Sequence, residues 1–467
     1  MSISRTLAEY IVDISYKDLP PEVIRCSKLC IFDWLGVALG GSVEEVSPIL
    51  IDFIQEMGGK KQATVLGSRL KTNVLSAVLV NGTMSHALDF DDTHTAASIH
   101  PSVCVAPAAT SVAEYKKLTG KDLITAFTLG FEIATRIGSA AGLSHYELGW
   151  HATSTVGRFG AAVATAKLLK LTPDEIVNAL GIAGTQIGGL REVFGTMCKP
   201  FQAGKAAMDG VMSAFLAKKG FDSSEKIFEG RYGVGNVYAA NADRDKLLAG
   251  LGGTDFQITR VVFKRYASAL ATHSAIEAVK EIRERENITA EDVGEINIEL
   301  GSLPMSVVDI RDPKRVLEAK FSIHHCVALA FIEGSAGQYM FTRKKLGDPK
   351  LADFREKVNA RLNRNFSRFE TKTIITTKNG KTFEKFIPVP KGSPENPVTF
   401  EEMKNKFKSL VYPILSREKA RQIFFAIKNL EESFDVGELM AMCVSKEGSG
   451  KPFQTFGKQR RKKDIEG

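Results

Sequence analysis

Six polar residues that could do chemistry crowd into one short stretch of the chain. They are Asp89, Asp91, Asp92, Thr93, His94 and His100. Buried charges must be paired or hydrogen-bonded, so a cluster of this kind lies either in solvent or in a functional site. Apolar runs at residues 74–79 and 103–109 flank the stretch. We therefore expect it to be carried into a packed region of the protein.

Three further clusters place histidine or lysine among small residues. They centre on His151, on Lys199 with Lys205, and on the pair His324–His325. Lysine neutralises a carboxylate as a point charge, whereas histidine donates to one or moves a proton near neutral pH. Removal of a proton α to a carboxylate needs a placed base and a cationic environment for the enolate. The clusters together predict an acid/base site for a small anionic molecule.

The same residues allow other interpretations. Imidazoles and carboxylates also bind zinc or non-haem iron, but the sequence has neither HExxH nor a facial HxD spacing, so we expect no metal. Asp91 and Asp92 also suit a helix N-terminus, and Lys199 a solvated loop. The pair His324–His325 suits one buried and one exposed imidazole. No GxGxxG after a strand, no GxxxxGK[ST] and no GxSxG motif is present.

The composition is that of an ordinary globular protein. Of 467 residues, 44% are hydrophobic and 25% are charged, which suits two or three domains with a sizeable core. The net charge of +8 includes five positive charges between Lys458 and Lys463, so the rest of the chain is nearly balanced. We therefore expect neither nucleic acid nor a membrane as a partner. A nucleic-acid- or partner-binding protein that uses this basic tail is the non-enzyme alternative.

Cysteine usage and the lack of targeting signals indicate the cytoplasm. Six scattered cysteines without a CxxC pair suit a reducing compartment. The first residues contain no signal-peptide apolar region, and no uncharged apolar run reaches membrane-spanning length. We expect a cytoplasmic protein.

Helices must position most of the polar clusters. Residues 3–14 and 20–41 follow helical spacing, the second beginning at a proline pair. Residues 172–175 combine a threonine N-cap, a first-turn proline and a capping box. The Ala- and Leu-rich segments 159–171 and 177–187 are typical of buried helices. Long helices without strand alternation predict a large all-α bundle.

The pattern changes after about residue 254. Residues 256–263 and 295–300 are strand-like, and residues 268–284 between them are typical of a helix. Residues 371–387 predict a β-hairpin, because Asn379-Gly380 supplies the positive φ angles of a tight turn. The chain is thus mainly α, with a smaller α+β part.

Four segments follow from these patterns. Residues 1–260 form the first part of a helical domain, and residues 261–395 form an α+β domain. Residues 396–445 return to helical structure, beginning at the capping sequence Thr399-Phe-Glu-Glu402. Residues 446–467 form a basic tail that we expect to be disordered.

The ordered set of motifs resembles the MmgE/PrpD family of 2-methylcitrate dehydratases, cis-aconitate decarboxylases and iminodisuccinate epimerases, over nearly the whole chain. The motifs are Asn81-Gly82, His86-Ala-Leu-Asp-Phe-Asp-Asp-Thr93, His100-Pro-Ser102, Gly149-Trp-His151-Ala-Thr, Lys199-Pro with Gly204 and Ala206-Ala207, Thr272-His273, Lys320-Phe-Ser322 and Gly392-Ser-Pro-Glu-Asn-Pro397. The resemblance implies one large helical domain built from both chain ends and an inserted α+β lid. The active site would lie between them, in a homodimer without metal or organic cofactor.

The resemblance also implies roles for individual residues. The family's catalytic positions fall on Asp89, Thr93, His100, His151 and Lys199. His325 falls where decarboxylase members carry a tyrosine, so an imidazole would replace a phenol as proton donor. The residues expected to bind substrate beside Lys199 are His86, Lys205 and His273. Lys205 would add a second cation for another carboxylate.

The implied reaction is that of a hydro-lyase on a small di- or tricarboxylic acid such as 2-methylcitrate. Lys199, with His151 or His100, would anchor the carboxylates. A histidine or Asp89 would take the α proton, and the β-hydroxyl would leave as water. Decarboxylation of the cis-aconitate type and epimerisation of the iminodisuccinate type share an enolate-like intermediate and stay open. The spacer from Thr93 to His100 is shorter than is typical of the methylcitrate dehydratases.

Overall fold

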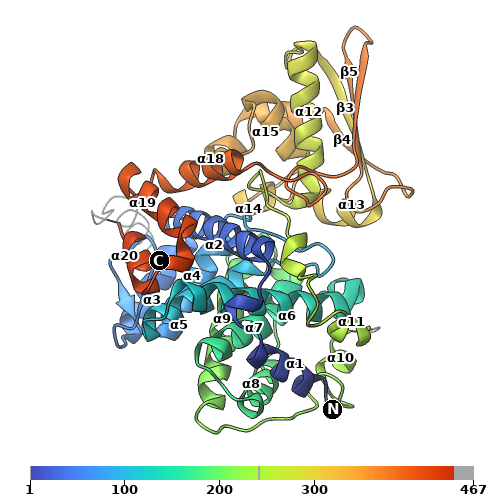
Figure 1. Cartoon of the computed structure of the whole chain (residues 1–467). Coiled ribbons are helices and arrows are strands. Elements are labelled where there is room, and N and C mark those ends of the chain that lie inside the picture. Colours follow the sequence, from blue (N-terminus) through green and yellow to red (C-terminus); the bar gives the residue numbers. More distant parts are fainter. Residues whose placement is uncertain (1, 240–241, 446–467) are drawn as a thin grey trace, which may run out of the picture.

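Helices build the larger part of the protein. The computed structural model describes residues 2–239 and 242–445, and its first eleven helices form one body (Figure 1). They are α1 (Ile3–Asp13), α2 (Pro21–Gly41), α3 (Val46–Met57), α4 (Val74–Ala87), α5 (Ser102–Lys116), α6 (Gly120–Glu147), α7 (Ala152–Leu168), α8 (Pro173–Thr185), α9 (Cys198–Ala217), α10 (Val234–Val237) and α11 (Asp245–Leu248). The helices predicted within residues 3–14, 20–41 and 159–187 are confirmed. A two-residue antiparallel pair, β1 (Ala63–Thr64) and β2 (Lys71–Thr72), lies between α3 and α4.

Local capping explains where two of the predicted helices begin. At α8, the Thr172 hydroxyl accepts from Glu175 N at 3.3 Å, and the Glu175 carboxylate accepts from Thr172 N at 2.7 Å. Thr399 and Glu402 form the same reciprocal pair at the start of α18 (Phe400–Val411). Each pair satisfies backbone N–H groups that the first helical turn leaves free, so both starts were readable from the sequence.

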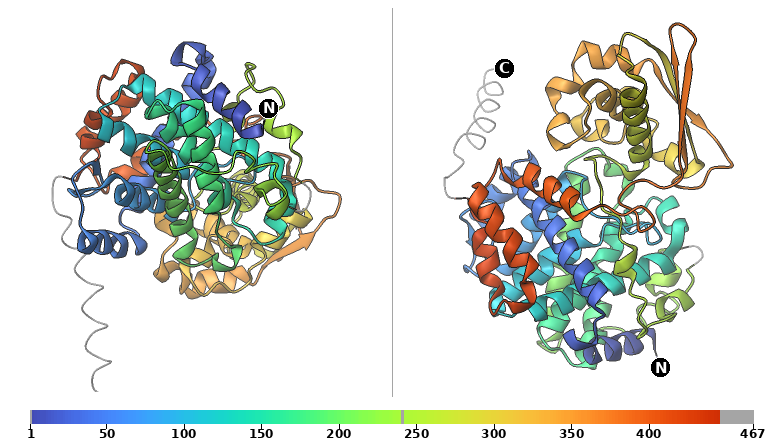
Figure 2. Two further views of the ribbon diagram at one scale, coloured as in Figure 1. Left: turned by 90° about the horizontal axis from the view of Figure 1, so that it is seen from below. Right: turned by 45° about the horizontal axis from the view of Figure 1, so that its top comes forward.

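Residues 261–395, here called the lid, contain the four-stranded sheet. Its strands are β3 (Val293–Leu300), β4 (Val358–Leu362), β5 (Thr371–Thr377) and β6 (Thr382–Ile387), and its helices are α12 (His273–Glu286), α13 (Ser302–Val308), α14 (Val316–Ala319), α15 (Ile323–Glu333), α16 (Arg343–Leu346) and α17 (Pro349–Arg355). The strand order is β4-β3-β5-β6, with β3 and β4 parallel and the other pairs antiparallel. Helix α12 packs along one face of the sheet, as Figure 1 and the right view of Figure 2 show. The predicted hairpin is confirmed, with Gly380 at φ 82° in its turn.

One predicted strand is wrong. Residues Gln257–Arg260 form a 3₁₀ turn, and Val262 makes only a single bridge to Thr93. Phe256 and Ile258 are buried, although no neighbouring strand lies alongside this part of the described chain. A short apolar run is compatible with any buried segment, so its pattern alone did not define a strand. The next helix also begins later than predicted, at His273, after a 3₁₀ turn at Leu270–Thr272.

The chain then returns to the helical body. Helices α18, α19 (Arg417–Lys428) and α20 (Val436–Met442) follow the lid, and α18 packs on α2 while α20 packs on α5 (Figure 1). The mainly α fold with a small α+β part is confirmed. The predicted disordered tail lies outside the described residues. Within residues 2–239 and 242–445, no helix is both long and apolar enough to cross a bilayer.

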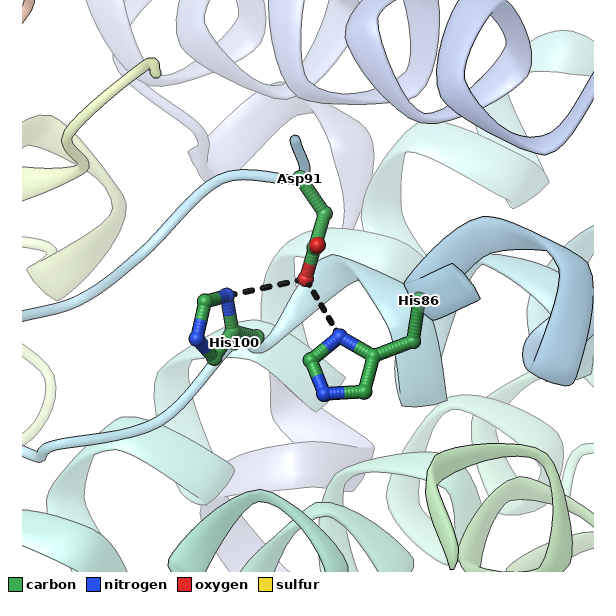
Figure 3. Close-up of side chains that lie close together, drawn as sticks. All are labelled: His86, Asp91 and His100. Carbon is green, nitrogen blue, oxygen red and sulfur yellow. Dashed lines mark hydrogen bonds and ion pairs between the residues drawn. The ribbon is translucent and has the colours of Figure 1, made fainter. Parts of the chain in front are cut away.

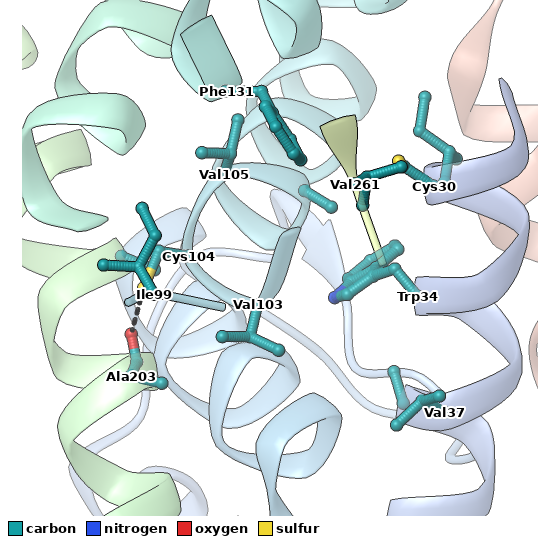
Figure 4. Packing of buried hydrophobic residues seen from close by; sticks show 14 of the residues in the cluster. Cys30, Trp34, Val37, Ile99, Val103, Cys104, Val105, Phe131, Ala203 and Val261 are labelled. Carbon is teal, nitrogen blue, oxygen red and sulfur yellow. Dashed lines mark hydrogen bonds between the residues drawn. The ribbon is translucent and has the colours of Figure 1, made fainter. Parts of the chain in front are cut away.

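The apolar core lies between α2, α5 and α6. Figure 4 shows Trp34 of α2, Val103 of α5 and Phe131 of α6 in this packing. All three are at most 1% exposed. Burying one large apolar side chain contributes roughly 1.5–3 kcal/mol, so this layer fixes the helices that flank the polar stretch.

Helices α4 and α9 cross at two glycines. A Cβ atom on Gly82 would lie 2.8 Å from the Cα of Gly204, and one on Gly204 would meet the carbonyl oxygen of Leu79. No side chain fits there, because the obstacle is backbone rather than a movable side-chain end. The crossing matters to the site because α4 carries His86 near its end and α9 carries Lys199 in its first turn.

We expect Gly204→Ala to lower the free energy of unfolding by roughly 1–3 kcal/mol, because the added methyl group forces α4 and α9 apart. Denaturant unfolding measures this change. Gly347→Ala is the matched control, since its nearest new contact would be an ordinary 3.5 Å. Equal stability of the two variants would contradict the proposed tight crossing.

Candidate active site

A cavity of about 120 Å³ lies where the helical body meets the lid. Its polar lining consists of Asp89, Thr93, Ser98, His100, Tyr146, His151, Thr153, Lys199, Lys264 and Arg368. Phe194 of the body and Leu303, Val307 and Phe321 of the lid add an apolar wall. Residues from both parts of the chain therefore share one cavity at their junction, which is where the family resemblance implies an active site.

Three lysines fix the backbone that carries Asp89. The carbonyl groups of residues 88, 89 and 90 accept hydrogen bonds from Lys320 Nζ, Lys264 Nζ and Lys406 Nζ at 2.6, 2.9 and 2.7 Å, respectively. Asp89 itself has φ 52°, a left-handed conformation that aspartate tolerates better than most residues. Lys264 and Lys320 belong to the lid, and Lys406 belongs to α18. The conformation of this turn therefore depends on distant segments.

The Asp89 carboxylate bridges two ammonium groups. Lys199 Nζ lies 2.5 Å from Oδ1, and Lys264 Nζ lies 2.9 Å from Oδ2. Burial alone would raise the pKa of Asp89, but Lys199 and Lys264 outweigh it and hold the pKa well below its ordinary value. One carboxylate thus stands against two cations, which leaves local positive charge for an anionic ligand.

Asp91 orients two imidazoles. Its Oδ2 accepts a hydrogen bond from Nδ1 of His86 at 2.9 Å and lies 2.8 Å from Nδ1 of His100 (Figure 3). His100 Nδ1 also donates to the Asp92 carbonyl at 2.9 Å. Burial alone would raise the pKa of Asp91, but His100 and His86 hold it well below its ordinary value. With Nδ1 donating, a neutral His100 keeps the lone pair of Nε2 for the cavity. Burial and the nearby Lys199 lower the pKa of His86 to about 4, so this ring is neutral at neutral pH.

His151 is oriented in the same way by an amide. The Gln202 side-chain N–H donates to Leu190 O at 3.2 Å, which turns its Oε1 toward His151 Nδ1 at 2.6 Å. Nδ1 must then donate, and Nε2 carries the lone pair. Burial, with His86 and Lys199, holds the pKa of His151 well below its ordinary value. His151 immediately precedes α7, and Phe194 packs edge-on against its ring with centroids 5.0 Å apart.

His86, Asp91 and His100 also bring three possible metal-ligand atoms within 4.8 Å of one another. His86 Nδ1 shares its proton with Asp91 Oδ2, and the proton of His100 Nδ1 faces the Asp92 carbonyl at 2.9 Å, with Asp91 Oδ2 at 2.8 Å. A metal ion would have to displace both protons. The arrangement fits a hydrogen-bonded imidazole pair better than a metal-ligand set, and the prediction of no metal stays a prediction.

The structure brings together five of the predicted catalytic residues. Asp89, Thr93, His100, His151 and Lys199 all line the cavity. Thr93 Oγ1 lies 3.3 Å from His100 Nδ1, and Lys199 is buried rather than part of a solvated loop. Their chemical roles stay predictions.

Four other predicted residues do not line the cavity. His86 lies behind His100, with ring centroids 4.9 Å apart. His273 and His325 are buried within the lid, where His325 Nδ1 faces Arg355 at 3.4 Å. Neither His324 nor His325 is exposed, contrary to the mixed alternative. Lys205 is 42% exposed and pairs with Asp209 on its own helix. The predicted binding and proton-donor roles at these positions therefore have no support from the cavity geometry.

Three ionisable lining residues were not predicted from the sequence, namely Lys264, Arg368 and Tyr146. Lys264 and Arg368 lie in segments without a motif, so only long-range contacts reveal them. Tyr146 lies near the end of α6, and burial raises the pKa of its phenol, which therefore stays protonated at neutral pH. Arg191 lies over its ring, 3.9 Å from the centroid. The cavity wall thus contains the phenol of Tyr146, whereas His325, the predicted proton donor, lies outside the lining.

Asp89→Asn should lower the free energy of unfolding by about 3–5 kcal/mol, because two buried ammonium groups lose their carboxylate. The depressed folded-state pKa means that this stabilisation is complete above about pH 4 and is lost as the pH falls through that pKa. Denaturant unfolding between about pH 6 and 8 should show a constant difference.

The control for this measurement is Asp243→Asn. Asp243 is 47% exposed and pairs with an exposed lysine, so its loss should change stability by less than about 1 kcal/mol. Two variants with the same denaturation midpoint would show that Asp89 does not neutralise the lysines.

Known proteins resemble the chain along nearly its whole length. A cis-aconitate decarboxylase-like protein of Aspergillus oryzae is 26% identical over 94% of this chain and 97% of its own. Human cis-aconitate decarboxylase is 27% identical over 94% of both chains. A mitochondrial 2-methylcitrate dehydratase of Yarrowia lipolytica is 24% identical over 78% of this chain and 73% of its own. The MmgE/PrpD N-terminal domain matches residues 5–246 and the C-terminal domain residues 266–432, so the chain belongs to the MmgE/PrpD family.

Proposed function

We propose that the protein is a cofactor-independent lyase that removes carbon dioxide from a small unsaturated tricarboxylic acid of the cis-aconitate type. The observation that carries this proposal is the buried Asp89 held between Lys199 and Lys264, opposite oriented imidazoles in one cavity. The near full-length similarity to cis-aconitate decarboxylases supports the substrate class.

The proposed reaction breaks one carbon–carbon bond and forms one carbon–hydrogen bond. The bond to a carboxylate breaks, carbon dioxide leaves, and the electron pair stays on carbon as an enolate-like anion conjugated with a remaining carboxylate. A proton then adds to that carbon. Fixed cations stabilise such an anion as its charge develops, because the charged side chains are already in position and do not have to reorient. Lys199 and Lys264 are the cations in place for this task.

The proton must come from a group that keeps it at neutral pH. We assign this role to the Tyr146 phenol, because burial raises its pKa and it lines the cavity. His100 and His151 each use Nδ1 for a fixed hydrogen bond, so Nε2 can take a proton from solvent water and pass it to the Tyr146 phenolate after each turnover.

A hydro-lyase acting on 2-methylcitrate is the second candidate. It is favoured by the similarity to the Yarrowia dehydratase and by the two imidazoles whose Nε2 lone pairs suit removal of an α proton. The proton balance separates the two reactions. Dehydration removes a proton from carbon and expels hydroxyl as water, whereas decarboxylation only adds a proton to carbon.

Proton NMR of the purified protein in D₂O, with cis-aconitate and 2-methylcitrate supplied separately, tests the proposal. We expect loss of carbon dioxide from cis-aconitate and one deuterium placed on the product carbon. A new alkene from 2-methylcitrate would establish the hydro-lyase instead, and silence on both acids would refute either lyase. Loss of activity after chelation would favour the metal reading of His86, Asp91 and His100.

Substitution of the two neighbouring lysines tests the assignment of the site. Lys199→Met should lower kcat/KM roughly 10²–10³-fold, because a cation that stabilises the developing anion is lost. Lys205→Met should stay near the unsubstituted protein, since Lys205 pairs with Asp209 outside the cavity. Steady-state kinetics on both variants measures this. The reverse pattern would restore Lys205 as the anchoring cation.

The homodimer and the cytoplasmic location also remain proposals that rest on the family resemblance and the composition. Light scattering on the purified protein would contradict a dimer if it gave the 51.0 kDa mass of one chain.

A further inference from the structure

Arg368 enters the cavity from the lid. It lies in the connection between β4 and β5, residues 363–370, and lines the same cavity as Lys199. Its Nη1 donates to the Thr95 carbonyl at 2.6 Å and to the Ser98 hydroxyl at 3.3 Å. Both acceptors belong to the polar stretch between α4 and α5, so Arg368 spans the junction of lid and body.

The charges along the cavity wall are unevenly matched. Among the described residues that line the cavity, Asp89 is the only one with a carboxylate. This carboxylate already pairs with Lys199 and Lys264. Arg368 meets only a carbonyl and a hydroxyl there, and it forms no ion pair with a described carboxylate. Burial lowers the pKa of Arg368, which reflects the cost of holding this charge away from water.

A guanidinium suits a carboxylate ligand better than its present partners do. Its five N–H groups lie in a plane and bind both oxygens of a carboxylate side by side. Only Nη1 is engaged with the polar stretch, so further donors remain for a molecule in the cavity. Lys199 and Lys264 supply positive charge at Asp89, and Arg368 supplies it from the lid.

We propose that Arg368 binds a second carboxylate of the substrate and so selects for acids with two or more carboxylates. This inference rests on the proposed function, in which the cavity takes a polycarboxylate. Ligand binding would then join lid and body through one molecule, with one carboxylate at the lysine pair and another at the guanidinium.

A purely positioning role for Arg368 would give a different result. The hydrogen bonds to residues 95 and 98 hold the stretch that carries Thr93 and His100. If Arg368 acted only through that stretch, its loss would weaken all ligands alike. If it binds a carboxylate, its loss weakens only those ligands that carry that carboxylate.

Calorimetry on the full chain separates these roles. The probes are tricarballylate, which is saturated and has three carboxylates, and butyrate, which has one. We expect Arg368→Gln to weaken tricarballylate roughly 10- to 100-fold, the range for a lost charge-assisted hydrogen bond. It should weaken butyrate by less than about threefold, because a single carboxylate is held by the lysine pair alone. Arg368→Lys, which keeps the charge without the planar fork, should lie between.

Arg364→Gln is the matched control, because Arg364 belongs to the same connection but is exposed and does not line the cavity. Equal affinities in the Arg364 and Arg368 variants, or an equal loss for tricarballylate and butyrate, would overturn the inference. A protein that binds these acids but converts neither cis-aconitate nor 2-methylcitrate would refute the proposed reaction and leave the anchor standing. A protein that binds none of them would refute both.

Discussion

The hydrogen bonds from three buried lysines to the carbonyls of residues 88–90 are the constraint on which the site depends. Asp89 sits in a left-handed conformation, and its carboxylate is held between two ammonium groups. Two of these lysines, Lys264 and Lys320, come from the lid, and Lys406 comes from α18. A turn after α4 is therefore fixed by the whole fold. Because removing one partner would leave a buried charge uncompensated, the network favours a single arrangement of lid, body and return helix.

Polar partners from the helical body also orient the two cavity imidazoles. Asp91 lies 2.8 Å from Nδ1 of His100 and Gln202 accepts from Nδ1 of His151, so Nε2 of each ring is left for the ligand space. Such second partners decide which nitrogen does the chemistry, although they do not touch a substrate. The cavity thus combines lone pairs from the helical body with fixed cations. This combination suits reactions that pass through an enolate-like anion, which is the feature that decarboxylation, dehydration and epimerisation share.

Division of the site between lid and body has a chemical consequence. The helical body supplies Asp89, the histidines and Lys199, whereas the lid segment supplies Lys264, Arg368 and an apolar wall. A ligand that reaches both the lid and the body displaces water from both walls of the cavity. The attraction between its carboxylates and the lysine and arginine side chains then becomes stronger, because less water screens it. Substrate choice and the orientation of lid and body are in this way linked through the same side chains.

The features that could be predicted from the sequence are those that depend on neighbours along the chain. Capping at Thr172 and Thr399, the Asn379-Gly380 turn and the dense cluster from Asp89 to His100 were all predictable, because their partners lie within a few residues. The remaining features depend on contacts between distant segments. The apolar run at 256–263 forms a 3₁₀ turn and a single bridge to Thr93, and no strand of the described chain pairs along it. Lys264 and Arg368 entered the site, and His273, His325 and Lys205 stayed outside the cavity lining. The direction of a side chain depends on packing between segments more than a hundred residues apart, and spacing along the chain carries no record of that.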